Sequence, residues 1–349
     1  VTPWEEPLDV YYMYRANYVS AAKDPMVYLV SHTWADRFEE GRRRATIEAY
    51  SNCDSVLLYN DMSNEKVTYL GRKKNNGTGT HFMWENRDIR YNVLRAVGYY
   101  KGKAVVEDIL VLNGLEQAPH FGILYQDTKP LLKGEDGYNY LYRINCGGDD
   151  FTDSFGQLWM QDNTNYSRSW ATSFNELNPY LASQRTTSDP IRGSRDWKLF
   201  QHFRFGRHQL EYNFPVADGM YRIEFYFTEP WHGTGGSASA DCEGLRIFDV
   251  AVNDSVVLDD LDIWAESAHD GACKKVVYAI VKGGLLKIHF PEVKAGQALI
   301  SGIAIASANS DSKPTLFPAS DWNWEKASKE VMEKTPKELL PEDKNARVS

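Results

Sequence analysis

The chain has 349 residues, of which 42% are hydrophobic and 25% are charged, a globular composition with room for about two domains. Its formal net charge of -9 argues against nucleic acid or anionic membrane as a partner, because proteins that bind phosphate backbones present basic surfaces. No apolar run approaches the roughly 20 residues that a membrane-spanning helix needs.

Residues 1–25 predict a single helix that belongs to neither of the domains expected in this chain. Apolar and aromatic residues recur there at mixed spacings of three and four, as in an amphipathic helix: Leu8, Tyr11, Tyr12, Tyr14 and Tyr18. The chain starts at Val1 rather than at Met. We therefore expect a piece excised from a longer polypeptide, although a cleaved signal peptide would leave the same start.

The rest of the chain predicts two β-sandwiches. Residues 26–117 contain seven short alternating runs about ten residues apart, one of them Lys66–Leu70, which indicate an immunoglobulin-type sandwich. Residues 118–139 are rich in Gly and Pro and indicate a linker packed against both neighbours. Residues 140–307 contain about eight or more strands with long loops, which favours a jelly-roll-like sandwich whose loops gather at one end. Residues 308–349 form a polar tail, compatible with disorder or with a further domain, in which a short helix is expected at 321–332.

An aromatic loop follows one of the predicted strands. Tyr221–Thr228 alternates between two faces and runs into a glycine-rich loop that carries Trp231 and His232. An indole beside hydrogen-bonding groups suits the C–H faces and hydroxyls of a sugar. The alternative, which the residue types leave open, is that Trp231 folds back as a lid on the core.

Several motifs of the second block occur one after another along the chain. Asn145–Asp149, Gly156–Asp162, Phe225–Glu229 and Arg246–Asp254, followed by Asp260–Ile263, resemble the malectin family of carbohydrate-binding domains over residues 140–306. The resemblance implies a β-sandwich whose loop end binds glucose-containing or related oligosaccharides through aromatics and an acidic residue.

The first block resembles a different family. Tyr50–Asn60, Gly71–Lys73, Phe82–Glu85 and Leu94–Lys103 are similar to the immunoglobulin-like domain that follows the barrel in glycoside hydrolase family two, the β-galactosidase and β-glucuronidase group. On this resemblance, residues 1–25 are the remnant of the final barrel helix. A (β/α)8 barrel needs about 250 residues, so the two catalytic carboxylates of such an enzyme have no place in this chain.

The resemblance to malectin selects candidate sugar-binding residues. Trp159 and the pair Trp231–His232 fall where family members have binding aromatics, with Trp and His in place of the usual Tyr and Phe. Core packing is the equal alternative for Trp159, and His232 is either a hydroxyl partner or a solvated loop residue. Tyr166 and Trp170, in the polar insertion 160–199, are further candidate contacts.

Charged residues give weaker candidates. The Arg204 guanidinium suits sugar hydroxyls, and pairing with a carboxylate is the alternative. Asp149, Asp150 and Asp153 form an acidic turn that is a weak calcium candidate, and solvent-facing turn carboxylates are the favoured interpretation. Four cysteines without Cys-x-x-Cys spacing argue against zinc and redox motifs. Cys242 and Cys273 are compatible with a disulfide and equally with buried thiols.

These observations predict an all-β, two-sandwich region that binds carbohydrate without catalysis and acts as a spacer in a larger β-galactosidase-like glycosidase. The expected partners are an oligosaccharide or polysaccharide and the parent's catalytic barrel, with no cofactor. The resemblance implies a periplasmic or secreted location. One alternative is a structural or oligomerisation role, and a disfavoured one is glycoside hydrolysis by loop carboxylates of this chain itself.

Overall fold

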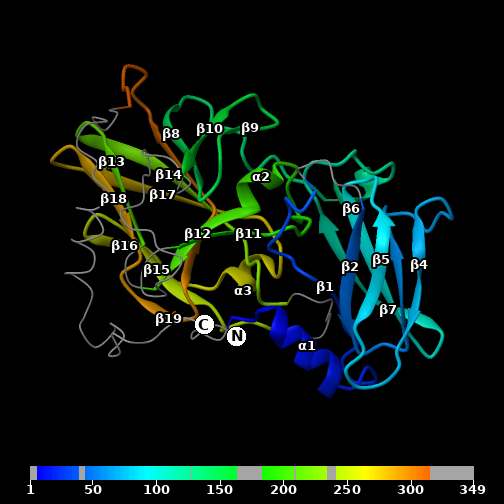
Figure 1. Cartoon of the computed structure of the whole chain (residues 1–349). Helices are drawn as coiled ribbons and strands as arrows, with labels where there is room; N and C mark the ends of the chain where they lie inside the picture. Colours follow the sequence, from blue (N-terminus) through cyan, green and yellow to red (C-terminus); the bar gives the residue numbers. More distant parts are fainter. Residues whose placement is uncertain are drawn as a thin grey trace, which may run out of the picture.

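A computed structural model describes residues 6–38, 44–125, 127–162, 183–207, 210–233 and 241–314. The chain is mostly β-strand, arranged as two sandwiches side by side (Figure 1), so the all-β prediction is confirmed. The described helical segments are short: α1 (Asp9–Tyr18), η1 (Phe121–Tyr125), α2 (Trp197–Phe200) and α3 (Ile263–Ser267). In the described part of the chain, no helix has the length and apolar character needed to cross a membrane.

The N-terminal sandwich is built from two sheets. One sheet has the strand order β1 (Val27–Leu29), β2 (Arg44–Ser51) and β5 (Phe82–Asp88). The other has the order β4 (Tyr69–Lys74), β3 (Ser55–Tyr59), β6 (Val93–Tyr100) and β7 (Lys103–Val111). Residues from both sheets share one core, which includes Ile47, Trp84 and Leu94. The connection between β2 and β3 packs closely on Gly98 of β6, where a Cβ would lie 2.7 Å from the Cys53 sulfur.

The second sandwich has a six-stranded sheet and a smaller sheet facing it. The larger sheet has the order β17 (Cys273–Val281), β14 (Gly219–Phe227), β21 (Gly302–Ser307), β8 (Asn139–Cys146), β10 (Leu158–Asp162) and β9 (Phe151–Thr152). The smaller has the order β13 (Glu211–Pro215), β18 (Leu285–His289), β15 (Ile247–Val252) and β16 (Ser255–Leu261), with β19 (Val293–Ala295) paired to β15. A further sheet joins β11 (Ser183–Thr186), β12 (His202–Gly206) and β20 (Ala298–Ile300).

Strand β14 is buried on both faces. Tyr221, Ile223, Phe225 and Phe227 point into the core of the second sandwich, as their alternation predicts. The opposite face is also covered: Glu224 is 1% exposed and forms ion pairs with Lys274 at 2.9 Å and Arg222 at 2.9 Å. The connecting segment lies over this face, where Lys274 Nζ donates to the Leu131 carbonyl at 2.9 Å.

Apolar packing and backbone hydrogen bonds join the two sandwiches. A third buried cluster combines Val93 of β6, Phe121 and Leu132 of the connecting segment, and Trp159 and Tyr226 of the second sandwich. The Ser188 amide donates to the His32 carbonyl at 2.6 Å, and the Val111 amide donates to the Ser188 carbonyl at 2.6 Å. Loop 186–193 of the second sandwich is therefore bonded directly to the first.

The N-terminal segment contacts both sandwiches (Figure 1). The Tyr12 ring of α1 stacks on Tyr28 of β1 with centroids 4.0 Å apart, and its hydroxyl donates to the Trp231 carbonyl at 3.2 Å. Further upstream, Glu6 lies fully buried beside Arg246 of the second sandwich.

The four cysteines, Cys53, Cys146, Cys242 and Cys273, are buried free thiols. The disulfide alternative for Cys242 and Cys273 is therefore wrong in this structure.

Candidate functional site

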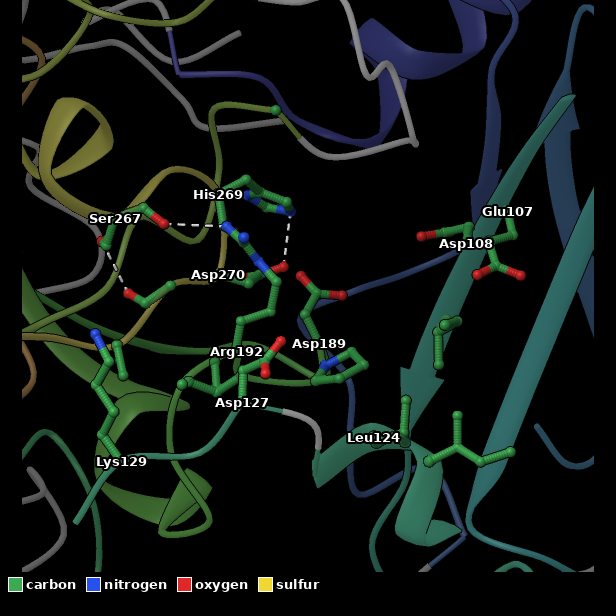
Figure 2. Close-up of a pocket in the computed structure, with 18 of the residues that line it drawn as sticks. Glu107, Asp108, Leu124, Asp127, Lys129, Asp189, Arg192, Ser267, His269 and Asp270 are labelled. Atoms are coloured by element: carbon green, nitrogen blue, oxygen red, sulfur yellow. Dashed lines mark hydrogen bonds and ion pairs between the residues drawn. The ribbon is translucent and has the colours of Figure 1, made fainter. Parts of the chain in front are cut away.

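A cavity of about 800 Å³ lies where the two sandwiches meet (Figure 2). Strand β7 contributes Glu107, Asp108 and Ile109, and the connecting segment contributes residues between 123 and 129. The second sandwich contributes two loops, 189–193 and 266–272, together with Gly233 from the loop after β14. A volume of this order is in the range of pockets that hold small-molecule ligands.

The loop 266–272 has a constrained backbone. Helix α3 ends at Ser267, and Ala268 follows with φ 56° and ψ −172°, a region that residues with a Cβ rarely occupy. At Gly271, an added Cβ would lie 2.0 Å from the Ser267 carbonyl oxygen, so the close turn requires glycine. The Arg192 guanidinium donates to the carbonyls of Ser267 at 3.0 Å and His269 at 2.6 Å. These contacts constrain the backbone from which the side chains of the loop project at the cavity wall.

Three polar side chains converge at this wall: Asp189, His269 and Asp270. One potential ligand atom from each lies within 4.8 Å of the others, and His269 Nε2 is 2.8 Å from Asp270 Oδ2. Burial and the neighbouring Asp189 raise the pKa of Asp270 to about 7, against the opposing influence of His269. Burial lowers the pKa of His269, but its ion pair with Asp270 outweighs this and raises it to about 9. At neutral pH His269 therefore keeps a proton that an isolated imidazole would largely have lost.

His32 links this cluster to the N-terminal sandwich. Its Nε2 lies 2.9 Å from Asp108 Oδ2 of β7, and its Nδ1 is hydrogen-bonded to Asp189. Burial lowers the pKa of His32, yet the two carboxylates raise it well above the ordinary value, so the imidazolium is the stable form at neutral pH. Figure 2 shows Asp189 lying between Asp270 on one side and Asp108 on the other.

The cavity lining is acidic overall. Its carboxylates are Glu107, Asp108, Asp127, Asp189, Glu266 and Asp270, whereas its permanent cations are Lys129 and Arg192. Ile109, Ile123 and Leu124 add apolar side chains to the lining, and Figure 2 shows Leu124 away from the loop that carries His269 and Asp270. An acidic, partly apolar cavity suits neutral hydroxyl-rich ligands or cations better than anions.

The predicted sugar residue Trp231 packs inward. Its ring is partly buried between Phe203 and Phe205, each 5.1 Å away and nearly perpendicular, and the Arg246 guanidinium lies 5.2 Å from the ring centre. These contacts match the alternative in which the indole folds back on the core. His232 is 5% exposed rather than solvated, and burial lowers its pKa. The backbone amides of both residues donate to Glu229 Oε1, at 3.0 and 3.1 Å.

Trp159 is a core residue, so its prediction as a sugar contact is wrong in this structure. The side chain is fully buried, stacks near Phe151 and meets the Tyr226 ring edge at a centroid distance of 5.3 Å. Its indole N–H donates to Asp153 Oδ2 at 2.9 Å. The core-packing alternative therefore holds, because no face of the indole is open to a ligand.

Arg204 is also an internal residue. It is fully buried and forms a two-point ion pair with Asp162, with nitrogen–oxygen distances of 2.7 and 3.1 Å. The Tyr212 hydroxyl donates to the same carboxylate at 2.8 Å. The prediction of Arg204 as a sugar contact is thus corrected to the alternative, pairing with a carboxylate, because a guanidinium without solvent access cannot reach a hydroxyl on a ligand.

The weak calcium candidates do not form a site among the described residues. Asp153 Oδ1 accepts the amides of Phe155 and Gln157, both at 2.9 Å, and its other oxygen accepts the Trp159 indole. Asp149 and Asp150 are exposed, and Asp150 caps the Gln161 amide at 2.6 Å. Asp153 therefore stabilises a turn from a buried position, whereas Asp149 and Asp150 are the exposed carboxylates of the favoured interpretation. Tyr166 and Trp170 lie outside the described residues.

Sequence reasoning missed the residues that line the cavity. Ser267–Gly271 contains a His-Asp pair followed by glycine between a short helix and a strand, a signal that could have been read as a rigid polar loop. His32 and Asp189 carried no usable signal, because they stand 157 positions apart in the sequence.

Comparison with known proteins defines the class of the second sandwich. Residues 140–309, just under half of the chain, match the family model of the malectin domain, so the second sandwich is malectin-like. Both cavity loops of the second sandwich fall within the matched residues. Malectin from Danio rerio is 25% identical over 150 residues, which are 43% of this chain and 47% of that protein. Malectin-B from Xenopus laevis is 24% identical over 149 residues, 42% of this chain and 48% of that protein.

Further similarities extend beyond malectin. A protein of Formosa agariphila, whose name assigns it provisionally as a beta-glucuronidase, is 29% identical over 107 residues, 31% of this chain and 12% of that protein. The chain thus matches just under half of the malectins and about an eighth of the Formosa protein. Among solved structures, Bacteroides uniformis beta-glucuronidase is 23% identical with a TM-score of 0.38, covering 86% of this chain and 32% of that one. The ANX2 ectodomain from Arabidopsis thaliana is 13% identical with a TM-score of 0.37, covering 81% of each chain.

Proposed function

We propose that this chain is the non-catalytic carbohydrate-binding and spacer region of a larger glycoside hydrolase, and that it binds saccharide in the cavity between the sandwiches. The observation that carries the proposal is the cavity itself, about 800 Å³, into which both loops of the malectin-like domain project polar groups. The similarity to the Formosa protein supports a glycosidase parent. The first sandwich, in this proposal an immunoglobulin-like spacer, closes the cavity from the other side.

The chemistry of the lining defines the ligand class. Carboxylates accept hydrogen bonds from sugar hydroxyls, and the exposed Lys129 ammonium donates them. Ile109, Ile123 and Leu124 offer apolar contact for C–H faces. Because carboxylates outnumber cations, a neutral saccharide is favoured over a uronate. The described lining contains no Phe, Tyr or Trp side chain, so we expect dissociation constants in the micromolar to millimolar range.

A glycan array followed by calorimetric titration of the full chain tests this proposal. Asp270→Asn removes a carboxylate from the cavity wall, and we expect it to weaken binding of any neutral saccharide identified on the array. Asp259→Asn is the matched control, because Asp259 is an exposed carboxylate outside the cavity lining. Saccharide binding that both variants retain unchanged, while Trp231→Ala abolishes it, would move the site to the loop after β14.

Enzymatic activity of the fragment provides a second readout. The proposal assigns bond cleavage to residues of the parent outside this chain, so chromogenic galactosides and glucuronides should not turn over. Turnover that a single Asp or Glu substitution in the cavity abolishes would contradict the non-catalytic role. In the proposed non-catalytic role, saccharide binding by this region raises the local concentration of the parent's catalytic domain at its glycan.

A purely structural role is the second candidate, and one observation favours it. Trp159 is fully buried in the cluster that joins the sandwiches, and Trp231 packs against Phe203 and Phe205 instead of facing solvent. Aromatics that suggested sugar contacts thus stabilise the protein. Absence of any array hit, together with a change of oligomeric state or tight binding to a separately expressed catalytic domain, would establish this role.

A further inference from the structure

We propose that Asp189, His269 and Asp270 form a binding site for one divalent transition-metal ion of the Zn²⁺ or Mn²⁺ type at the wall of the interdomain cavity. This inference does not depend on saccharide binding. The three side chains each offer one ligand atom, and these atoms lie within 4.8 Å of one another. Two atoms bound at about 2.1 Å to one metal lie roughly 3 to 4 Å apart, so small side-chain adjustments bring all three into range.

One carboxylate oxygen of Asp270 is available to bind a cation. Its side chain is 7% exposed, and among the described residues its Oδ1 has no hydrogen-bond partner. A buried carboxylate oxygen without a partner costs free energy that a cation would recover. Because Asp270 lines the cavity and its Oδ2 already faces His269 Nε2, a cation next to both groups would contact the unpartnered Oδ1.

His269 has the orientation of a metal ligand. Its Nδ1 lies 3.1 Å from the Glu229 carbonyl oxygen, and since a carbonyl can only accept, Nδ1 carries the proton. The ring is thereby oriented with Nε2 toward Asp270, and metal binding would displace the proton from Nε2. Metal-ligating histidines usually donate the other ring N–H to a carbonyl or carboxylate in this way.

Hydrogen bonds from two neighbouring side chains orient the Asp189 carboxylate. The Thr187 hydroxyl donates to Asp189 Oδ2 at 2.7 Å, and His32 binds the other oxygen. Such supporting hydrogen bonds fix a ligand carboxylate before the metal arrives. The cavity provides the entry path and space for the water molecules that complete the coordination.

The donor set favours one class of metal. One imidazole nitrogen and two carboxylates suit Zn²⁺ or Mn²⁺, whereas Ca²⁺ and Mg²⁺ prefer oxygen ligands throughout. A second acidic group, Asp249, Asp259 and Asp260, shows the contrast. It contains no histidine, two of its members are exposed, and Asp260 is paired with Lys294. This group therefore carries no proposal and serves as the control for non-specific binding by carboxylates.

Calorimetric titration of the full, EDTA-treated chain with ZnCl₂, MnCl₂ and CaCl₂ tests the site, with metal content measured by mass spectrometry after dialysis. We expect one Zn²⁺ or Mn²⁺ per chain, bound more tightly than Ca²⁺, and a higher melting temperature with metal. Asp270→Asn should weaken binding at least about tenfold, and Thr187→Val about 10- to 100-fold, by analogy with other supporting residues. Asp259→Asn should leave the affinity unchanged.

The choice of variants separates ligand loss from misfolding. Asp270 has φ 53°, a conformation that Asn tolerates well, so Asp270→Asn should fold with a metal-free melting temperature close to that of the wild type. Failure to find saturable 1:1 binding, or an affinity that Asp270→Asn leaves intact, would overturn the proposal. Preferential binding of Ca²⁺ that survives His269→Gln would overturn the assignment of a nitrogen-containing metal site.

Discussion

Replacement of Glu229 by Gln tests how much the buried ion pair between Glu229 and Arg246 stabilises the folded protein. Arg246 is fully buried between two carboxylates: its Nε lies 2.5 Å from Glu229 Oε2, and its Nη1 lies 3.3 Å from Glu6 Oε1. Burial opposes ionisation of Glu229, but the charge and hydrogen bonds of Arg246 prevail and lower the pKa of Glu229 from 4.5 to about 2.

This pKa sets both the size and the pH range of the effect. Since one pKa unit corresponds to about 1.4 kcal/mol, ionised Glu229 contributes about 3 kcal/mol to the free energy of unfolding at pH 7. The folded pKa is depressed, so this contribution is complete above about pH 4.5 and is lost as the pH falls toward about 2. At pH 3 it should amount to about 1 kcal/mol.

Urea unfolding of wild type and Glu229→Gln at pH 7 and pH 3 measures the difference. The destabilisation should be about 3 kcal/mol at pH 7 and about 1 kcal/mol at pH 3. Glu211→Gln is the control, because Glu211 forms a more exposed ion pair with Lys287, for which less than about 1 kcal/mol is expected. If Glu229→Gln destabilised the protein equally at both pH values, ionisation of Glu229 would not be the source of the stability.

Three further substitutions test the internal packing. Trp159→Ala should lower the free energy of unfolding by about 3–5 kcal/mol through loss of core packing; a stable variant with weakened saccharide binding would restore Trp159 as a sugar contact. Arg204→Met should lower the free energy of unfolding by about 3–5 kcal/mol, because it leaves Asp162 buried without its cation. Adding Asp162→Asn should recover part of this loss. A double variant less stable than the Arg204→Met variant would refute this pairing argument. Gly271→Ala places a Cβ against the Ser267 carbonyl and should lower the melting temperature, whereas Gly122→Ala, where a Cβ meets nothing within 4 Å, should not; equal shifts would contradict the requirement for glycine.

The all-β fold could be predicted because alternation is a local property of the chain. Tyr221–Thr228 was expected as a strand with one buried aromatic face, and β14 covers Gly219–Phe227 with those aromatics in the core. The prediction of a strand at Lys66–Leu70 was less accurate. Strand β4 spans Tyr69–Lys74 and includes Gly71, which has φ 127°. Glycine there resembles a turn signal, yet its carbonyl accepts the indole N–H of Trp84 from β5 of the other sheet.

The candidate site could be predicted only in part, because burial depends on residues distant in sequence. Nothing near Trp159 in the sequence distinguishes a ligand platform from a core residue; the cluster that buries it includes Val93 and Leu132, from other parts of the chain. The same holds for Arg204, whose partner Asp162 is 42 positions away. The cavity escaped prediction because it exists only where separate loops and strands meet.

The backbone hydrogen bonds of Ser188 affect how the molecule unfolds. Its amide and carbonyl are both bonded across the boundary, to His32 and Val111, so neither hydrogen bond survives if one sandwich separates from the other. The amide protons of Ser188 and Val111 should therefore exchange with deuterium no faster than the boundary opens. With the cluster around Trp159 spanning the same boundary, the two sandwiches are expected to melt as one cooperative unit, and slow exchange at these two amides would report that shared stability directly.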